Sequence, residues 1–326
     1  MLDLLLIPLL AAHLLCMNVA SAAPVVCCWL EWKAKRGDAL ADSTAQYLGE
    51  ASWRLLLIGA VLGACYGAMQ WNADYQHLWT HILRYKAQMA IGEYLFSLGL
   101  LLLYAKLPRP AKMGTGGRSG RMLLAFLAGT NLLYHFPFLF SVASSLQAEA
   151  PLDAPLNVSG FRQAMLRPDV LARVVHIVLA SFAVTSLMLF GFAMRLQKEA
   201  SPPPDMERLA RWGGWLGLIP SLAQMLVGLW LVAALPPAWQ QRLLGEDWLA
   251  TIMLGISVLA TFTLLQDFAA LALGEFQAPL MRRSMLLMVV IVVLMTGTLK
   301  RIHPPVSSTV VSQISEPSSV PAGDQP

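Results

Sequence analysis

The chain has 326 residues, of which 57% are apolar and 13% charged, and its mean hydropathy is +0.59. Soluble domains carry about 25% charged residues, so the composition excludes a soluble enzyme, a nucleic-acid-binding protein and a disordered scaffold as descriptions of the whole chain. The sequence is that of a membrane protein, and the net charge of +4 is interpreted in that setting.

Eight apolar stretches approach the length of about 20 residues that a helix needs to cross a bilayer core of about 30 Å. In chain order they cover residues 4–30, 55–71, 88–107, 122–146, 170–196, 212–235, 248–273 and 284–299. We therefore predict an all-α fold, a polytopic membrane helix bundle of about eight transmembrane helices.

The distribution of Lys and Arg predicts the orientation of these helices. The first, third, fifth and seventh loops hold 15 of the 23 cationic residues, and the other loops with the tail hold the remaining 8. Because cytoplasmic loops are enriched in Lys and Arg, both termini are predicted to lie on the periplasmic side of a bacterial inner membrane.

Three regions follow from these spans. Residues 1–199 are predicted to form the functional helix bundle, residues 200–302 the C-terminal membrane helices, and residues 303–326 a disordered tail rich in Ser and Pro. The longest outer loop, 147–169, contains a segment at 161–166 that predicts a short interfacial helix.

Ionisable residues inside membrane spans are costly and usually functional. His13 and His135 lie about 13 and 16 Å below the outer ends of their predicted spans, whereas Glu93 and His176 lie about 8 to 9 Å below theirs. The depths predict two levels of polar groups, with His13 and His135 near the membrane midplane.

Histidines on separate helices at matched depth predict a site for haem, since haem iron takes axial His or Met and helix bundles hold cofactors between facing helices. Ala180 and Ala183, on the same face as His176, leave room for a flat macrocycle, and Arg173 can reach a propionate. The alternative is that each histidine forms only a hydrogen bond to a neighbouring helix, which is also the favoured interpretation of Asn131.

The order of these motifs resembles subunit I of the cytochrome bd quinol oxidases, the CydA-like proteins. The similarity covers the first-span His13, the stretch Ala90-Ile91-Gly92-Glu93, the stretch Gly129-Thr130-Asn131-Leu132 and, most closely, residues 167–191 around His176. The resemblance implies that His13 ligates a high-spin haem, that His176 ligates a low-spin haem, and that Glu93 is the membrane glutamate of that family.

The later part of the chain departs from the family. The connection 197–211 is too short for the family's quinol-binding loop, and Leu235-Pro236-Pro237-Ala238-Trp239 stands where the family has Gly-Arg-Gln-Pro-Trp. His135 matches no family ligand. Depth pairs His13 with His135 on one haem, whereas the resemblance assigns His13 and His176 to different haems, with Met225 as a candidate second ligand beside His176.

The sequence therefore predicts an integral membrane protein that binds one or two haem b groups and passes electrons near the outer face to or from a redox partner. A c-type cytochrome or an oxidase subunit is the expected partner, in a surrounding of membrane lipid, and Glu93 is expected to handle a proton. Two alternatives stay open: an oxygen-reducing terminal oxidase subunit with a CydB-like partner, with quinol as donor, and a haem-free transporter or assembly scaffold.

Overall fold

The structure is a computed structural model that describes residues 2–107, 114–147, 154–199 and 205–302. Within these residues all regular structure is helical, and eight helices are long and apolar enough to cross a membrane. They are α1 (Leu2–Ala34), α2 (Ala39–Met69), α4 (Arg84–Lys106), α5 (Gly114–Leu146), α7 (Pro168–Leu196), α8 (Met206–Ala234), α10 (Trp248–Leu273) and α11 (Ala278–Ile302). The predicted all-α, eight-span architecture is confirmed, and the protein is a multi-pass membrane protein.

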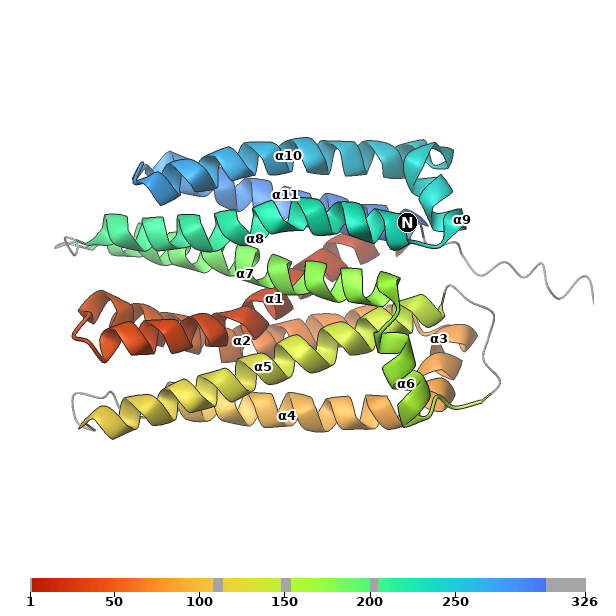
Figure 1. The fold of residues 1–326 in the computed structure, drawn as a ribbon, viewed down its shortest axis with the longest axis horizontal. Helices are drawn as coiled ribbons and strands as arrows, with labels where there is room; N and C mark the ends of the chain where they lie inside the picture. The colour runs from red at the N-terminus through yellow and green to blue at the C-terminus, as the bar shows by residue number, and fades with distance from the viewer. Residues whose placement is uncertain (1, 108–113, 148–153, 200–204, 303–326) are drawn as a thin grey trace, which may run out of the picture.

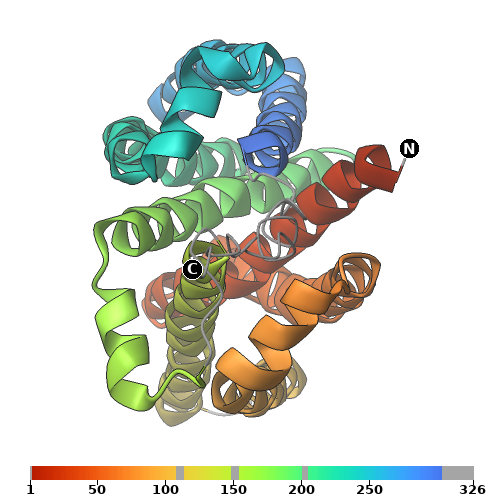
Figure 2. The same cartoon turned by 90° about the vertical axis from the view of Figure 1, so that its right-hand side faces the viewer.

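The long helices form two groups of four (Figure 1). One group contains α1, α2, α4 and α5, and the other contains α7, α8, α10 and α11. Helix α1 runs obliquely between the groups and packs against α2, α5, α7 and α11 (Figure 2). The largest buried apolar cluster spans both groups, with Leu48, Phe190 and Phe268 among its fully buried members. The core is thus continuous across the junction that α1 makes.

The short helices lie at the end of the molecule opposite the α1–α2 turn (Figure 1). They are α3 (Ala73–His77), the π-helix η1 (Leu78–Ile82), α6 (Val158–Met165), α9 (Pro237–Gln241) and the π-helix η3 (Arg242–Glu246). Helix α6 is the short interfacial helix predicted at 161–166. Both the start of α1 and the end of α11 lie at this same end. The predicted tail, 303–326, lies outside the described residues.

Several helices begin earlier than the hydropathy pattern predicts, among them α2 and α11. Helix α2 starts at Ala39 rather than at Leu55, and α11 starts at Ala278 rather than at Ser284. The extra turns of α2 are polar, which lowers their hydropathy, but their groups are satisfied locally because the Asp38 side chain caps the Ala41 amide at 3.1 Å. The α1–α2 hairpin therefore extends further than a bilayer core requires.

Close approach between α8 and α10 depends on a glycine, which leads to a first prediction. A Cβ atom at Gly214 would overlap the backbone nitrogen of Ala272 and lie 2.8 Å from its Cα atom. Because backbone cannot move aside cheaply, Gly214→Ala is expected to lower the free energy of unfolding by about 1–3 kcal/mol. A Cβ atom at Gly228 on the same helix would have nothing within 4 Å, so Gly228→Ala is the control. Unfolding by dodecyl sulfate in mixed micelles measures both, and equal effects would contradict the packing argument.

Candidate functional site

Helix α7 places the buried side chain of Arg173 one turn from the half-buried side chain of His176. The helix begins with Pro168 at its first turn, and Arg173 and His176 follow on its inward face. Arg173 is only 9% exposed, and its Nη1 donates to the carbonyl oxygen of Ser141 on α5 at 3.3 Å. The Nη2 atom of Arg173 and the Nδ1 atom of His176 are buried without a hydrogen-bond partner among the described residues. These two atoms are free to bind a group that the chain itself does not supply.

Further unpartnered atoms lie close to this pair. The hydroxyl of Ser141 and the indole nitrogen of Trp79 are also buried without partners in the described part of the chain. The ring of Trp79, in η1, packs against Phe140 with 5.8 Å between centroids, and Phe140 is the chain neighbour of Ser141. Buried polar atoms are nearly always hydrogen-bonded, so the unpartnered atoms of Arg173 and Ser141, which meet where α7 contacts α5, mark a candidate polar binding site.

Helix α8 reaches the same region through Gln224. Its Nε2 donates to the carbonyl oxygen of His176 at 3.4 Å. The predicted second ligand, Met225, is the next residue of α8 and is partly buried. The structure thus places the Gln224–Met225 step beside the His176 turn.

His13 faces α2. Its Nδ1 lies 2.7 Å from the carbonyl oxygen of Gly59, and a Cβ atom at Gly63 would lie 2.6 Å from its Cε1. The glycines of α2 therefore let α1 approach closely, as small residues do between membrane helices. A histidine whose Nδ1–H donates to a carbonyl presents Nε2 as a lone-pair donor, which is the orientation usual in metal ligation.

His135 and Glu93 face each other across α5 and α4. Nε2 of His135 lies 3.8 Å from Oε1 of Glu93, with side-chain exposures of 38% and 25%. Asn131 fixes the same crossing, since its Nδ2 donates to the carbonyl oxygen of Glu93 at 3.0 Å and to the Ser97 hydroxyl at 2.8 Å. The interhelical interpretation of Asn131 is confirmed, and the histidine and the glutamate lie within ion-pair distance of each other.

The contact between Glu93 and His135 corrects the predicted levels. Sequence depth placed Glu93 with His176 and placed His135 deeper with His13, but α4 begins at Arg84 rather than at Gln88. Measured from Arg84, Glu93 lies about 14 Å along its helix, close to the roughly 16 Å of His135 from the end of α5. The prediction of separate levels for these two residues is wrong because the start of the span was placed one turn too late.

The structure does not gather the predicted residues into one cluster. Within the described residues, no group of three or more His, Cys, Asp or Glu side chains is close enough to hold a metal ion. The polar contacts of His13 lie on α2, those of His135 on α4, and that of His176 on α8. Each histidine therefore has its own surroundings.

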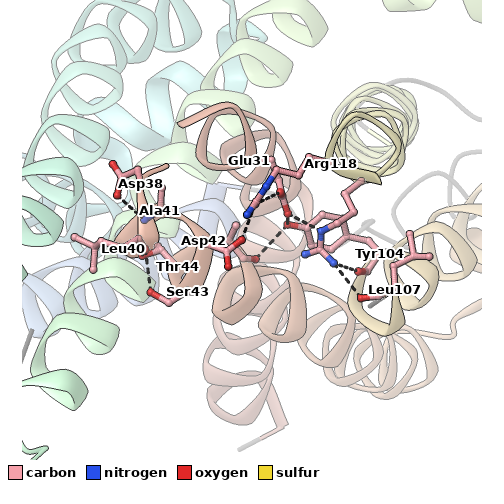
Figure 3. A network of polar contacts seen from close by, with 12 residues as sticks. Glu31, Asp38, Leu40, Ala41, Asp42, Ser43, Thr44, Tyr104, Leu107 and Arg118 are labelled. Carbon is pink, nitrogen blue, oxygen red and sulfur yellow. Dashed lines mark hydrogen bonds and ion pairs between the residues drawn. The ribbon is translucent and has the colours of Figure 1, made fainter. Parts of the chain in front are cut away.

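A buried ionic network lies at the end of the first group of helices that carries the α1–α2 turn (Figure 3), and it was not predicted from the sequence. Glu31 of α1 has a side chain only 1% exposed, and its carboxylate accepts from Arg121 Nε at 2.7 Å and from Arg118 Nη1 at 3.3 Å. The Tyr104 hydroxyl donates to the same carboxylate at 3.0 Å, and Arg118 also binds Asp42 at 2.6 Å. The network joins α1, α2, α4 and α5.

Its signal was present in the sequence. In the sequence Arg118 and Arg121 are charges of the third loop. Arg121 directly precedes the predicted fourth span, and Glu31 directly follows the first. Opposite charges at ends that must lie at the same membrane face are candidates for pairing. The full satisfaction of these groups indicates a role in holding the helices together.

Comparisons with known proteins agree with this architecture. No family model matches the chain, and no curated protein matches it either. Among solved structures, a chain of the bd oxidase from Geobacillus thermodenitrificans superimposes with a TM-score of 0.76 at 13% sequence identity, covering 96% of this chain and 92% of that chain. The two chains are thus similar in length as well as in path. The resemblance predicted from sequence motifs is confirmed at the level of the fold, and the protein has the fold of a cytochrome bd oxidase subunit.

Proposed function

We propose that the protein binds haem b and transfers electrons as a subunit of a membrane oxidase-type complex. The observation that carries the proposal is the pair of buried, unpartnered nitrogens on α7, Nδ1 of His176 and Nη2 of Arg173. An imidazole nitrogen suits an axial position on iron, and a guanidinium one turn away suits a propionate. The residues present therefore fit the group.

The proposed assignments follow from these surroundings. His176 would hold the iron, Arg173 would bind a propionate, and Met225 is the proposed second ligand from α8. His13 remains a proposed ligand of a second haem, because its bond to Gly59 leaves Nε2 available. His135 was also predicted as a ligand, but its position beside Glu93 supports a role in proton exchange more than a role on iron.

Bound haem supplies one-electron oxidation and reduction near the membrane surface. The chain's own residues set the conditions for that chemistry. Burial among apolar side chains lowers the local dielectric. The positive charge of Arg173 favours the reduced state of the site, which carries one more negative charge than the oxidised state. Glu93 and His135 take up or release a proton when that charge changes.

Orientation and partners are part of the proposal. The Lys and Arg distribution places the end that carries α3, α6 and α9 on the periplasmic side of a bacterial inner membrane, with both termini there. That end is also where His176 and Arg173 lie along α7. A c-type cytochrome or another oxidase subunit is the proposed redox partner, and quinol is the alternative donor.

A reduced-minus-oxidised spectrum of the protein, purified after expression with haem supplied, tests the proposal. We expect the Soret and α bands of haem b with a stoichiometry of one or two per chain. The absence of these bands from a folded, monodisperse preparation would contradict it. A spectral shift of the reduced protein in carbon monoxide would indicate an open iron position and favour an oxygen-reducing subunit.

The role of Glu93 gives a further prediction. If Glu93 accepts the redox-linked proton, the midpoint potential of the wild-type haem falls with rising pH, by at most about 59 mV per unit for one proton and one electron. Glu93→Gln is expected to reduce this slope by more than half, since the titrating group is gone. Potentiometric titration across a range of pH measures it, with the exposed Glu50→Gln as control. An unchanged slope in Glu93→Gln would remove Glu93 from the mechanism.

One observation favours a second candidate, a haem-free subunit of such a complex. Two of the predicted histidines already have partners within the chain, His13 at Gly59 and His135 at Glu93. In that case all the histidines act between helices, and the purified protein carries no Soret band. The same spectrum therefore decides between the two candidates.

A further inference from the structure

A hollow of about 450 Å³ opens between the end of α7 and the start of α11, at the end of the molecule that carries the α1–α2 turn. Three cationic side chains line it, Arg195 and Lys198 from the last turn of α7 and its exit, and Arg282 from the first turns of α11. All three residues are exposed. We refer to this feature as the basic hollow.

The cations of the basic hollow lack carboxylate partners within the described residues, although their neighbours have them. Arg283 pairs with the buried Asp267, and Arg208 pairs with Asp38 at 2.6 Å. No ion pair of this kind involves the three cations that line the basic hollow, and the exposed acids nearest in sequence, Glu199 and Glu275, are in none either. The concentrated positive charge therefore favours an anion from outside the chain.

The remaining walls decide which kind of anion fits. Gly191, Met194 and Ala278 line the hollow on the side of the two membrane helices. Gly191 lacks a side chain, which leaves space beside α7, and Met194 gives a flexible apolar surface. A free phosphate makes no favourable contact with apolar walls, whereas a lipid presents a phosphate to the cations and acyl chains to the apolar residues. Basic pockets between membrane helices are suited to anionic headgroups.

We propose that the basic hollow binds the phosphodiester headgroup of an anionic phospholipid, held by Arg195, Lys198 and Arg282, with its acyl chains along α7 and α11. Each cation near a membrane surface contributes about a fivefold gain in affinity for anionic lipid. The site is independent of haem and lies at the opposite end from His176.

Native mass spectrometry of the full chain, released from mixed micelles, tests the site with phosphatidylglycerol and phosphatidylcholine as probes. We expect the wild-type chain to retain phosphatidylglycerol over phosphatidylcholine, and the variant R195Q/K198Q/R282Q to lose at least tenfold of that preference. The matched control is K35Q/R36Q/K106Q, which removes the same charge from the α1–α2 turn and the last residue of α4 at the same end. Lys198→Gln alone, at an exposed position, provides a milder variant with an expected loss of about fivefold.

Each outcome decides the proposal. Loss in the triple variant and in Lys198→Gln, with retention in the control, supports it. Equal loss in the control variant overturns it, because the preference is then a property of the whole basic surface. Displacement of phosphatidylglycerol by millimolar inorganic phosphate also overturns it, since a free anion then suffices. If the triple variant fails to fold, an unchanged preference in Lys198→Gln overturns the proposal.

Discussion

His176→Ala is expected to lower the haem b absorbance from the site proposed on α7 by at least tenfold. Loss of even a residue that hydrogen-bonds to a metal ligand costs about 10 to 100-fold in metal binding, and His176 is the proposed ligand itself. The imidazole of His176 has a buried nitrogen without a partner among the described residues, so alanine removes the proposed ligand and no hydrogen bond of that nitrogen. The measurement is the absorbance of the reduced Soret and α bands per purified chain. A second haem bound through His13 would remain.

Controls separate ligation from folding in this experiment. His81→Ala changes an exposed histidine in η1 at the same end of the molecule and is expected to leave the spectrum intact. Arg173→Leu is expected to shift the midpoint potential and weaken haem retention without abolishing the bands, since it removes the proposed propionate partner and one hydrogen bond to the Ser141 carbonyl but leaves the proposed iron ligand in place. Full retention of the haem spectrum in each of the single variants His13→Ala, His135→Ala and His176→Ala would contradict the assignment of these histidines as haem ligands.

The largest stability effect is expected at the buried network around Glu31. Arg121→Met removes a partner that donates to a carboxylate only 1% exposed and leaves that charge under-compensated. Breaking a buried ion pair in this way costs about 3–5 kcal/mol. Unfolding by dodecyl sulfate in mixed micelles, followed by helix content, gives the loss in free energy directly.

Two further variants test the physical reason. The double variant Glu31→Met with Arg121→Met removes both charges, so most of the stability should return because a buried pair replaced by apolar groups is often neutral. Arg54→Met breaks an exposed pair with Glu50, whose side chains are 59% and 39% exposed. Such pairs are worth about 0.2–1 kcal/mol. A loss in Arg121→Met no greater than in Arg54→Met would show that the buried network contributes little.

The number and type of the membrane helices were predictable because each span is long and continuously apolar. The start of α2 at Ala39 was not, because hydropathy registers Asp42 and Glu50 as polar and cannot register that Arg118 and Arg54 pair with them. The π-helices η1 and η3 were also missed, since a one-residue widening of a helix has no periodic signal over five residues.

Parts of the candidate site were predictable on local grounds. The three-residue spacing of Arg173 and His176 places them on one helix face whatever the fold. The pairing of Glu93 with His135 was not predicted, because it depends on where α4 begins and an error of one turn moves Glu93 by about 5 Å. Which helix each histidine faces is a property of tertiary packing, and neither depth nor motif order contains it.

The position of α1 between the two groups has a consequence for how the chain is made. Among the eight long helices α1 is made first and α11 last, yet the two pack together, with Ile7 near Gly297. The face of α1 that meets α11 therefore has no partner until α11 has been made. A chain that lacked α11 would therefore leave this apolar face of α1 without its partner helix.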